Sequence, residues 1–185
     1  MADIGYTCHN CYVSWTGEMK EKAFTLVEVI LVVTILGILA ALVLPTFQGH
    51  IVKARESAAK DNLRVMRNQI ELYKLQHKGI PPGYVDGSAG PEALLQLQFT
   101  VTSDETGAVS PSTVPSDPFI YGPYIKRLPE NPFNKLSNIT YVPEATDFSA
   151  AVDGTSSGWL YKKETGEIKI NWTGTDSEGT AFYDY

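Results

Sequence analysis

The feature that most constrains this 185-residue chain is a long apolar run near its N-terminus. From residue 24 to residue 44 it is long enough for a helix of roughly 30 Å, which matches the hydrocarbon core of a bilayer. One carboxylate, Glu28, lies near its start. An ionised group in hydrocarbon costs ~2.5–3.5 kcal/mol on insertion scales, so a carboxylate there generally has a partner. The run therefore predicts a membrane-spanning helix in which Glu28 has a specific role.

Two simpler interpretations explain only part of this pattern. A secretory signal peptide would use Lys20 and Lys22 as its basic region, but the apolar run is longer than a typical signal core. No convincing polar cleavage region follows it, and a helical pattern continues past Pro45. A plain membrane anchor explains the length of the run but gives Glu28 no purpose.

The string KAFTLVE, residues 22–28, resembles the processing site of type IV pilins and of type II secretion pseudopilins. The resemblance implies that a membrane prepilin peptidase cuts between Ala23 and Phe24 and that the new amino group of Phe24 is methylated. It also implies that Glu28 pairs with the terminal ammonium of a neighbouring subunit during filament assembly. Ala23 departs from the glycine that is usual before the cut, although it is also small.

Cleavage at this site would remove residues 1–23 as a leader. If translation began at Met19, residues 19–23 would be a complete short leader and residues 1–18 an upstream extension; otherwise the leader is unusually long. Both cysteines, Cys8 and Cys11, lie in this part, and two ligands are only half a zinc site. We therefore expect no metal there and no disulfide in the mature chain.

Two residues weaken the helix between residues 37 and 45. Gly37 disfavours a helix interior by ~1 kcal/mol relative to alanine, and Pro45 removes a backbone hydrogen bond and clashes with the preceding turn. In the filaments that the motif resembles, this stretch loses helical order on assembly, which implies the same here. For the isolated subunit we expect a simple kink at Pro45 in an otherwise uninterrupted helix.

Residues 46–79 continue as an amphipathic half of the helix. Apolar side chains recur at steps of four and three, so one stripe should pack on a sheet. This stripe consists of Ala59, Leu63, Met66, Ile70 and Tyr73. The other face carries charged residues, including Lys60 and Arg67, and should meet water or neighbouring molecules. Gly79 can supply a left-handed cap, and together with the two prolines that follow it should end the helix.

Residues 80–185 predict a head of long loops around a small sheet. Residues 92–97 could form one or two helical turns, and residues 104–117 a surface loop. Strands at 158–162 and 167–171, joined by a tight turn, predict a hairpin, with a third antiparallel strand at 139–142. The expected fold class is α+β: a long N-terminal helix packed on a small C-terminal antiparallel sheet, the pilin fold.

Two segments of the head extend the resemblance to major pseudopilins. Residues 122–133 resemble their Pro-Asp-Pro-Trp segment, with Asn131 and Phe133 replacing the commoner Asp and Trp. Residues 173–180 concentrate oxygen donors, the ligands that Ca²⁺ prefers, with Asp176 and Glu178 as candidate ligands. The resemblance implies calcium near this end, while a solvated acidic turn is the alternative, because the spacing is not that of an EF-hand.

The remaining sequence predicts a structural protein. With three histidines, no phosphate-binding loop and a net charge of −6, it indicates neither an enzyme nor a nucleic-acid partner. We expect the major pseudopilin of a type II secretion system, which polymerises to drive protein export. The alternatives are a pilin for adhesion or motility and a membrane-anchored periplasmic binding protein.

Expected partners are other copies, the prepilin peptidase, the inner-membrane assembly platform and minor pseudopilins. The chain should cross the bacterial inner membrane once, with its head in the periplasm, before entering a periplasmic or extracellular filament.

Overall fold

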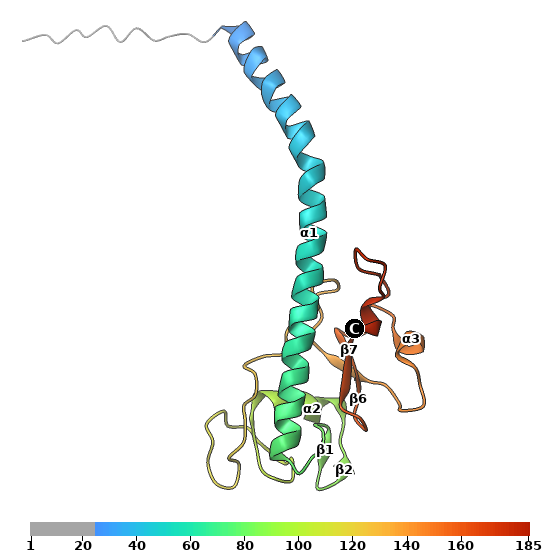
Figure 1. The fold of residues 1–185 in the computed structure, drawn as a ribbon. Coiled ribbons are helices and arrows are strands. Elements are labelled where there is room, and N and C mark those ends of the chain that lie inside the picture. The colour runs from blue at the N-terminus through green and yellow to red at the C-terminus, as the bar shows by residue number, and fades with distance from the viewer. Residues whose placement is uncertain (1–24) are drawn as a thin grey trace, which may run out of the picture. The chain divides into compact units, whose positions relative to one another are not determined.

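The computed structural model describes residues 25–185, without the side chains of residues 44–48. The predicted leader, Ala23 and Phe24 therefore lie outside the described residues. The chain divides into two units, Met1–Pro45 and Thr46–Tyr185, and each is considered by itself. Helix α1, Leu26–Gln76, begins in the first unit and ends in the second (Figure 1).

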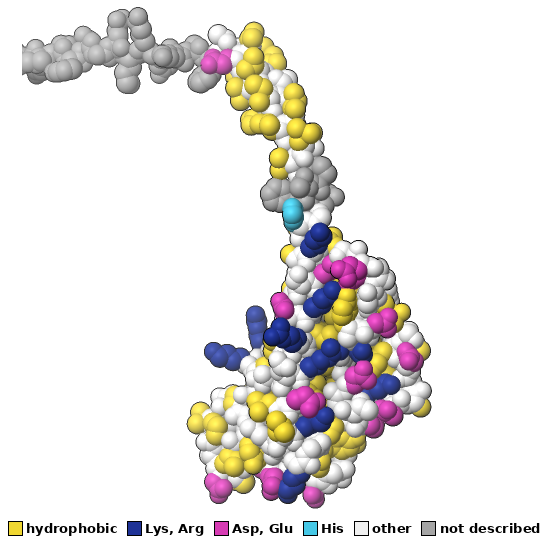
Figure 2. Space-filling view, viewed as in Figure 1, with side chains coloured by type: hydrophobic (Ala, Val, Ile, Leu, Met, Phe, Trp, Pro, Cys, Tyr) yellow, Lys and Arg dark blue, Asp and Glu magenta, His cyan; other side chains and the backbone are white. Residues whose placement is uncertain are grey.

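In the first unit, α1 is apolar and exposed. The segment Leu26–Val43 has a mean hydropathy of 2.9 and none of it is buried, so it is long and apolar enough to cross a membrane. Figure 2 shows these apolar side chains covering the helix. The backbone is helical at both Gly37 and Pro45. The surroundings of Gly37 are open, because a Cβ atom added at that position would meet nothing within 4 Å apart from the adjacent residues and the nearby backbone of the helix itself.

The C-terminal end of α1 lies at Gln76, three residues before the predicted end at residue 79. Lys78 and Gly79 both have positive φ, 55° and 83°, and the N–H of Gly79 donates to the carbonyl of Lys74 at 2.8 Å. This is the six-to-one bond of a Schellman cap with Lys78 in the left-handed position. The prediction that Gly79 holds that position was wrong, because the chain leaves the helix one residue earlier.

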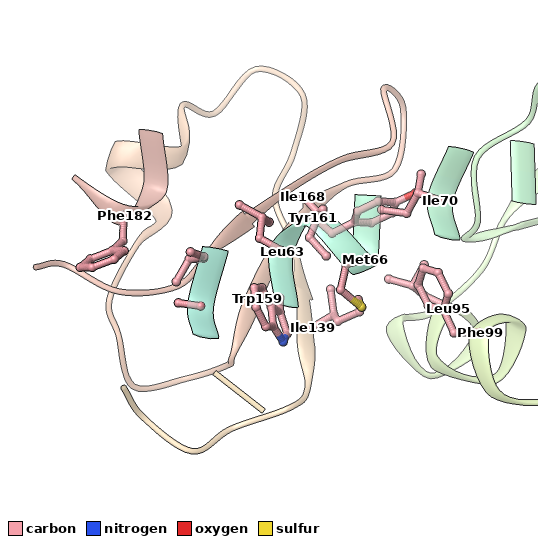
Figure 3. Close-up of a cluster of buried hydrophobic side chains, with 12 residues drawn as sticks. Leu63, Met66, Ile70, Leu95, Phe99, Ile139, Trp159, Tyr161, Ile168 and Phe182 are labelled. Atoms are coloured by element: carbon pink, nitrogen blue, oxygen red, sulfur yellow. The ribbon is translucent and has the colours of Figure 1, made fainter. Parts of the chain in front are cut away.

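The predicted apolar stripe of α1 is confirmed as the centre of the core in the second unit. Its five residues are each at most 2% exposed. The first four belong to one cluster with side chains of α2 and the three-stranded sheet (Figure 3). The other members of that cluster are Leu95, Phe99, Ile139, Trp159, Tyr161, Ile168, Ile170 and Phe182.

The sheet contains β5, Ile139–Tyr141, β6, Trp159–Lys162, and β7, Glu167–Ile170, in that order. The predicted hairpin is confirmed, since β6 and β7 are antiparallel. The prediction of a purely antiparallel sheet was wrong, because β5 is parallel to β6. The long connection between them includes α3, Phe148–Ala151. It carries the chain back to the end of the sheet at which β5 began, as a parallel pair requires.

The rest of the head combines α2, Glu92–Thr100, with two small hairpins and a final turn of 3-10 helix. The helix is longer than the one or two turns predicted at residues 92–97. The hairpins pair β1, Tyr84–Val85, with β2, Ser88–Ala89, and β3, Thr102–Ser103, with β4, Val109–Ser110; the final turn is η1, Phe182–Asp184. Strands of two residues leave no alternation to detect in sequence. The overall α+β class is confirmed.

The structure explains why residue 131 is an asparagine. Its side chain is completely buried, and Nδ2 donates to the carbonyls of Gly158 at 3.0 Å and Asn171 at 3.1 Å. Its Oδ1 accepts the N–H of Phe133 at 3.0 Å. An ionised aspartate has no N–H to donate, so it would leave both carbonyls without this partner. The departure from the Pro-Asp-Pro-Trp segment thus has a structural cause.

Candidate functional site

Glu28 lies in the first turn of α1 among exposed apolar side chains. Its amide N–H donates to Thr25 Oγ1 at 3.2 Å, and within the described residues its carboxylate has no hydrogen-bond or ion-pair partner. By contrast, the hydroxyl of Thr34 is satisfied inside the helix by the carbonyls of Ile30 and Leu31, both at 2.8 Å. An unpaired polar group is costly in hydrocarbon, so the carboxylate of Glu28 needs a partner, whereas the hydroxyl of Thr34 already has its hydrogen bonds.

The two predicted calcium ligands do not bring their carboxylates together. The side chain of Asp176 is 1% exposed, and its Oδ1 accepts the N–H groups of Glu178 and Thr180, both at 2.9 Å. Its Oδ2 accepts from Lys60 Nζ at 3.0 Å and from the hydroxyl of Tyr185. Glu178 is exposed and contributes its backbone N–H rather than its carboxylate.

This donor set does not fit a calcium ion in the observed arrangement. Both oxygens of Asp176 already accept hydrogen bonds, and an ammonium lies where a cation would bind. Among the side chains that the structure describes, no group of three or more His, Cys, Asp or Glu residues could hold a metal ion. The Tyr185 hydroxyl and then the Lys60 ammonium hold the pKa of Asp176 well below its usual range, so this carboxylate is ionised at neutral pH.

Sequence reasoning placed Lys60 and Arg67 on the face of α1 that meets water or neighbours, but they hold the C-terminal segment. Arg67 Nη2 donates to the carbonyl of Ile168 at 3.2 Å and to the main-chain oxygen of Tyr185. Glu56, only 7% exposed, accepts the hydroxyl of Ser177 at 3.0 Å. One available signal was missed: Glu56 lies three residues before Ala59 and so continues the apolar stripe, which means that its buried carboxylate needs a hydrogen-bond partner.

The structure also brings together a buried polar pair that the sequence did not indicate. His77 stacks on Tyr73 with ring centroids 3.7 Å apart, and its Nε2 lies 3.1 Å from Ser103 Oγ. Its Nδ1 lies 2.8 Å from the carbonyl of Tyr73. A histidine beside a serine is a combination found in hydrolases. Here His77 is 2% and Ser103 0% exposed, so neither can reach a substrate, and the pair joins the end of α1 to β3.

The burial of His77 predicts a pH-dependent stability. Burial lowers its pKa below 6.5, although hydrogen bonds with the backbone of Tyr73 and Asp104, and then the charges of Asp104 and Glu105, partly oppose the shift. The unfolded chain therefore binds more protons, and the stabilisation present above pH ~6.5 should be lost as the pH falls toward the lower folded pKa. We expect the free energy of unfolding to fall over this window in the wild type and less steeply in His77→Gln. The exposed His50→Gln is the control, and an equal slope in His77→Gln would contradict the assignment.

Comparison with known proteins agrees with the motif and the fold. A family model described as the prokaryotic N-terminal methylation motif matches residues 19–44, which include Ala23, Phe24 and Glu28. The chain is 31% identical to type II secretion system core protein G of Aeromonas hydrophila over 78% of this chain and 96% of that protein. The chain belongs to the core protein G family.

Other members of the core protein G family match over a similar extent. Those of Vibrio cholerae and Escherichia coli are each 31% identical over 83% of this chain and 92% of their own length. The fimbrial protein EcpB of Eikenella corrodens is 42% identical, but over only 34% of this chain and 38% of that protein. No solved structure matches the chain.

Proposed function

We propose that this chain is the major filament subunit of a type II secretion system and that its polymerisation drives protein export. The observation that carries the proposal is the 31% identity to the core protein G of Aeromonas hydrophila across 96% of that protein's length. An alignment of this extent includes the head as well as the N-terminal motif. It therefore supports a whole subunit of this type rather than a shared export signal.

The exposed apolar surface of α1 fits a subunit that moves from the membrane into a filament. Leu26–Val43 suits the hydrocarbon of the inner membrane before assembly, and the same side chains can pack against other copies afterwards. Cleavage between Ala23 and Phe24 would place a positive amino group four residues before Glu28, the spacing at which helical residues share a face. We assign Glu28 to pairing with the Phe24 amino group of a neighbouring copy, and Gly37 and Pro45 to local loss of helix in the filament.

The proposed partners follow from this sequence of membrane insertion, cleavage and assembly. A prepilin peptidase would process the chain, an inner-membrane platform would extract it, and minor pseudopilins would join the filament. The second unit, Thr46–Tyr185, which includes the head, would face the periplasm. The energy would come from a cytoplasmic ATPase, and we assign the chain itself no catalytic role, which its relatives' names also favour.

A surface pilin is the second candidate, and the match to fimbrial protein EcpB is the observation that favours it. That match covers 62 residues, whereas the match to the Aeromonas core protein G covers 156. The N-terminal motif is common to both classes, so the longer match favours secretion. Deleting the gene distinguishes them: loss of protein export supports the secretion filament, and loss of adhesion or motility with normal export supports the pilin.

Mass spectrometry of the protein purified from its own cells tests the processing step. We expect a mature chain that begins at N-methylated Phe24 in normal cells and an uncut chain in cells lacking the prepilin peptidase. Residues 1–23, including both cysteines, should be absent from the mature protein. Mature material that retains Met1 or Met19 would contradict the proposal.

A further inference from the structure

A set of polar contacts fastens the C-terminal segment, residues 173–185, to α1. We call it the C-terminal clasp and define it as Glu56, Lys60 and Arg67 of α1 with Asp176, Ser177 and Tyr185. We propose that the ammonium of Lys60 is the cation that closes this clasp, so that the subunit fixes its C-terminal loop without a calcium ion. This inference concerns the stability of the head and goes beyond the proposed role in secretion.

The loop around Asp176 is closed by its own backbone. Thr175 and Ala181 form an antiparallel bridge, and the N–H of Asp176 donates to the carbonyl of Thr180 at 2.9 Å. The N–H of Gly179 returns to the carbonyl of Asp176 at 3.1 Å, in a turn where Gly179 has φ of 88°. Oδ1 of Asp176 accepts the N–H groups of Glu178 and Thr180, and Oδ2 is the oxygen that meets α1.

Lys60 supplies the positive charge at that oxygen. Its Nζ lies 3.0 Å from Asp176 Oδ2 and 4.1 Å from the centroid of the Tyr185 ring. The Tyr185 hydroxyl donates to the same oxygen, so the ammonium meets both a carboxylate and an aromatic face. A divalent ion at Oδ2 would have to displace Lys60, because two cations that close repel strongly.

A lysine and a bound ion differ in how they stabilise the head. The stability that a bound ion adds to a fold depends on the ratio of its free concentration to its dissociation constant, and it disappears when the ion is removed. Lys60 is part of the chain, 116 residues from Asp176, and is present at any calcium concentration. The clasp should therefore hold equally well in the presence and absence of calcium, both in the periplasm and outside the cell.

Thermal unfolding of the full chain in detergent micelles, followed by circular dichroism, tests this. We expect the wild-type midpoint to be the same in excess EDTA and in excess CaCl₂. Lys60→Met should lower it by at least about 3 °C, the scale of a modest stability loss in a chain of this size. Lys60→Arg should stay close to wild type, and the exposed Lys53→Met is the matched control.

A double variant separates the charge from the packing of the lysine stem. Lys60→Met leaves Asp176 buried without a cation, so adding Asp176→Asn should cost less than it does in the wild-type background. A wild-type midpoint that falls in EDTA and recovers with CaCl₂ would overturn the proposal. So would a Lys60→Met midpoint equal to that of Lys53→Met, or strictly additive effects in the double variant.

Discussion

Replacing Glu28 with alanine should abolish filament formation while the amount of subunit in the membrane stays unchanged. Glu28 is the one charged residue in the apolar segment Leu26–Val43, and its carboxylate has no partner among the described residues. In the filament, its proposed partner is the amino group of Phe24 in another copy. Removing one member of a buried ion pair costs about 3–5 kcal/mol, because the remaining charge is left uncompensated.

A cost of this size at every subunit contact should reduce filaments at least about a hundredfold, since 1.4 kcal/mol corresponds to a factor of ten. Insertion should not suffer, because alanine removes an ionised group that costs ~2.5–3.5 kcal/mol in hydrocarbon. The measurements are filaments sheared from cells and subunit in isolated membranes. Glu71→Ala is the control, since it removes only an exposed contact to Lys74. Normal filaments with Glu28→Ala would refute the role assigned to Glu28.

Replacing Trp159 with alanine should destabilise the head by about 3–5 kcal/mol, the usual cost of removing a buried aromatic side chain. Trp159 is completely buried in β6, in the cluster that includes the apolar stripe of α1 (Figure 3). Its indole Nε1–H also donates to the carbonyl of Pro129 at 2.9 Å. The substitution would therefore leave a cavity and an unpaired carbonyl together, and domains are stable by only about 5–15 kcal/mol.

Urea unfolding of the full chain in micelles, followed by circular dichroism, measures this loss without depending on tryptophan fluorescence. Trp172→Ala is the matched control, because Trp172 is only partly buried and stacks on Phe133 with ring centroids 5.3 Å apart. We expect it to cost less than half as much as Trp159→Ala. Equal losses for the two variants would show that Trp159 is not at the centre of the core.

The elements that sequence predicted well depend on neighbours along the chain. The membrane segment follows from a run of apolar residues, and the core face of α1 follows from the 3.6-residue period, which brings Leu63, Met66 and Ile70 onto one side. The β6–β7 hairpin has two strands joined by a short turn that ends in Gly166 at φ of 79°. In each case the information lies within a few residues of the element that it specifies.

The elements that sequence missed depend on residues far apart. The direction of β5 is set by how the connection through α3 returns, and buried His77 meets Ser103, which lies 26 residues further along the chain. The same holds for residues 176 and 178, where an acidic pattern indicated two ligands for a metal. The fold turns Asp176 inward, leaves Glu178 in solvent and brings Lys60 to the carboxylate.

The sequence by itself therefore determined the N-terminal apolar helix with its single carboxylate at Glu28, since burial in lipid depends on the local run of side chains. It also determined the α+β class. Only the tertiary structure decided which cation meets Asp176, because Lys60 and Asp176 are 116 residues apart and no local period relates them. Their pairing requires the packed core to hold α1 and the C-terminal segment against each other.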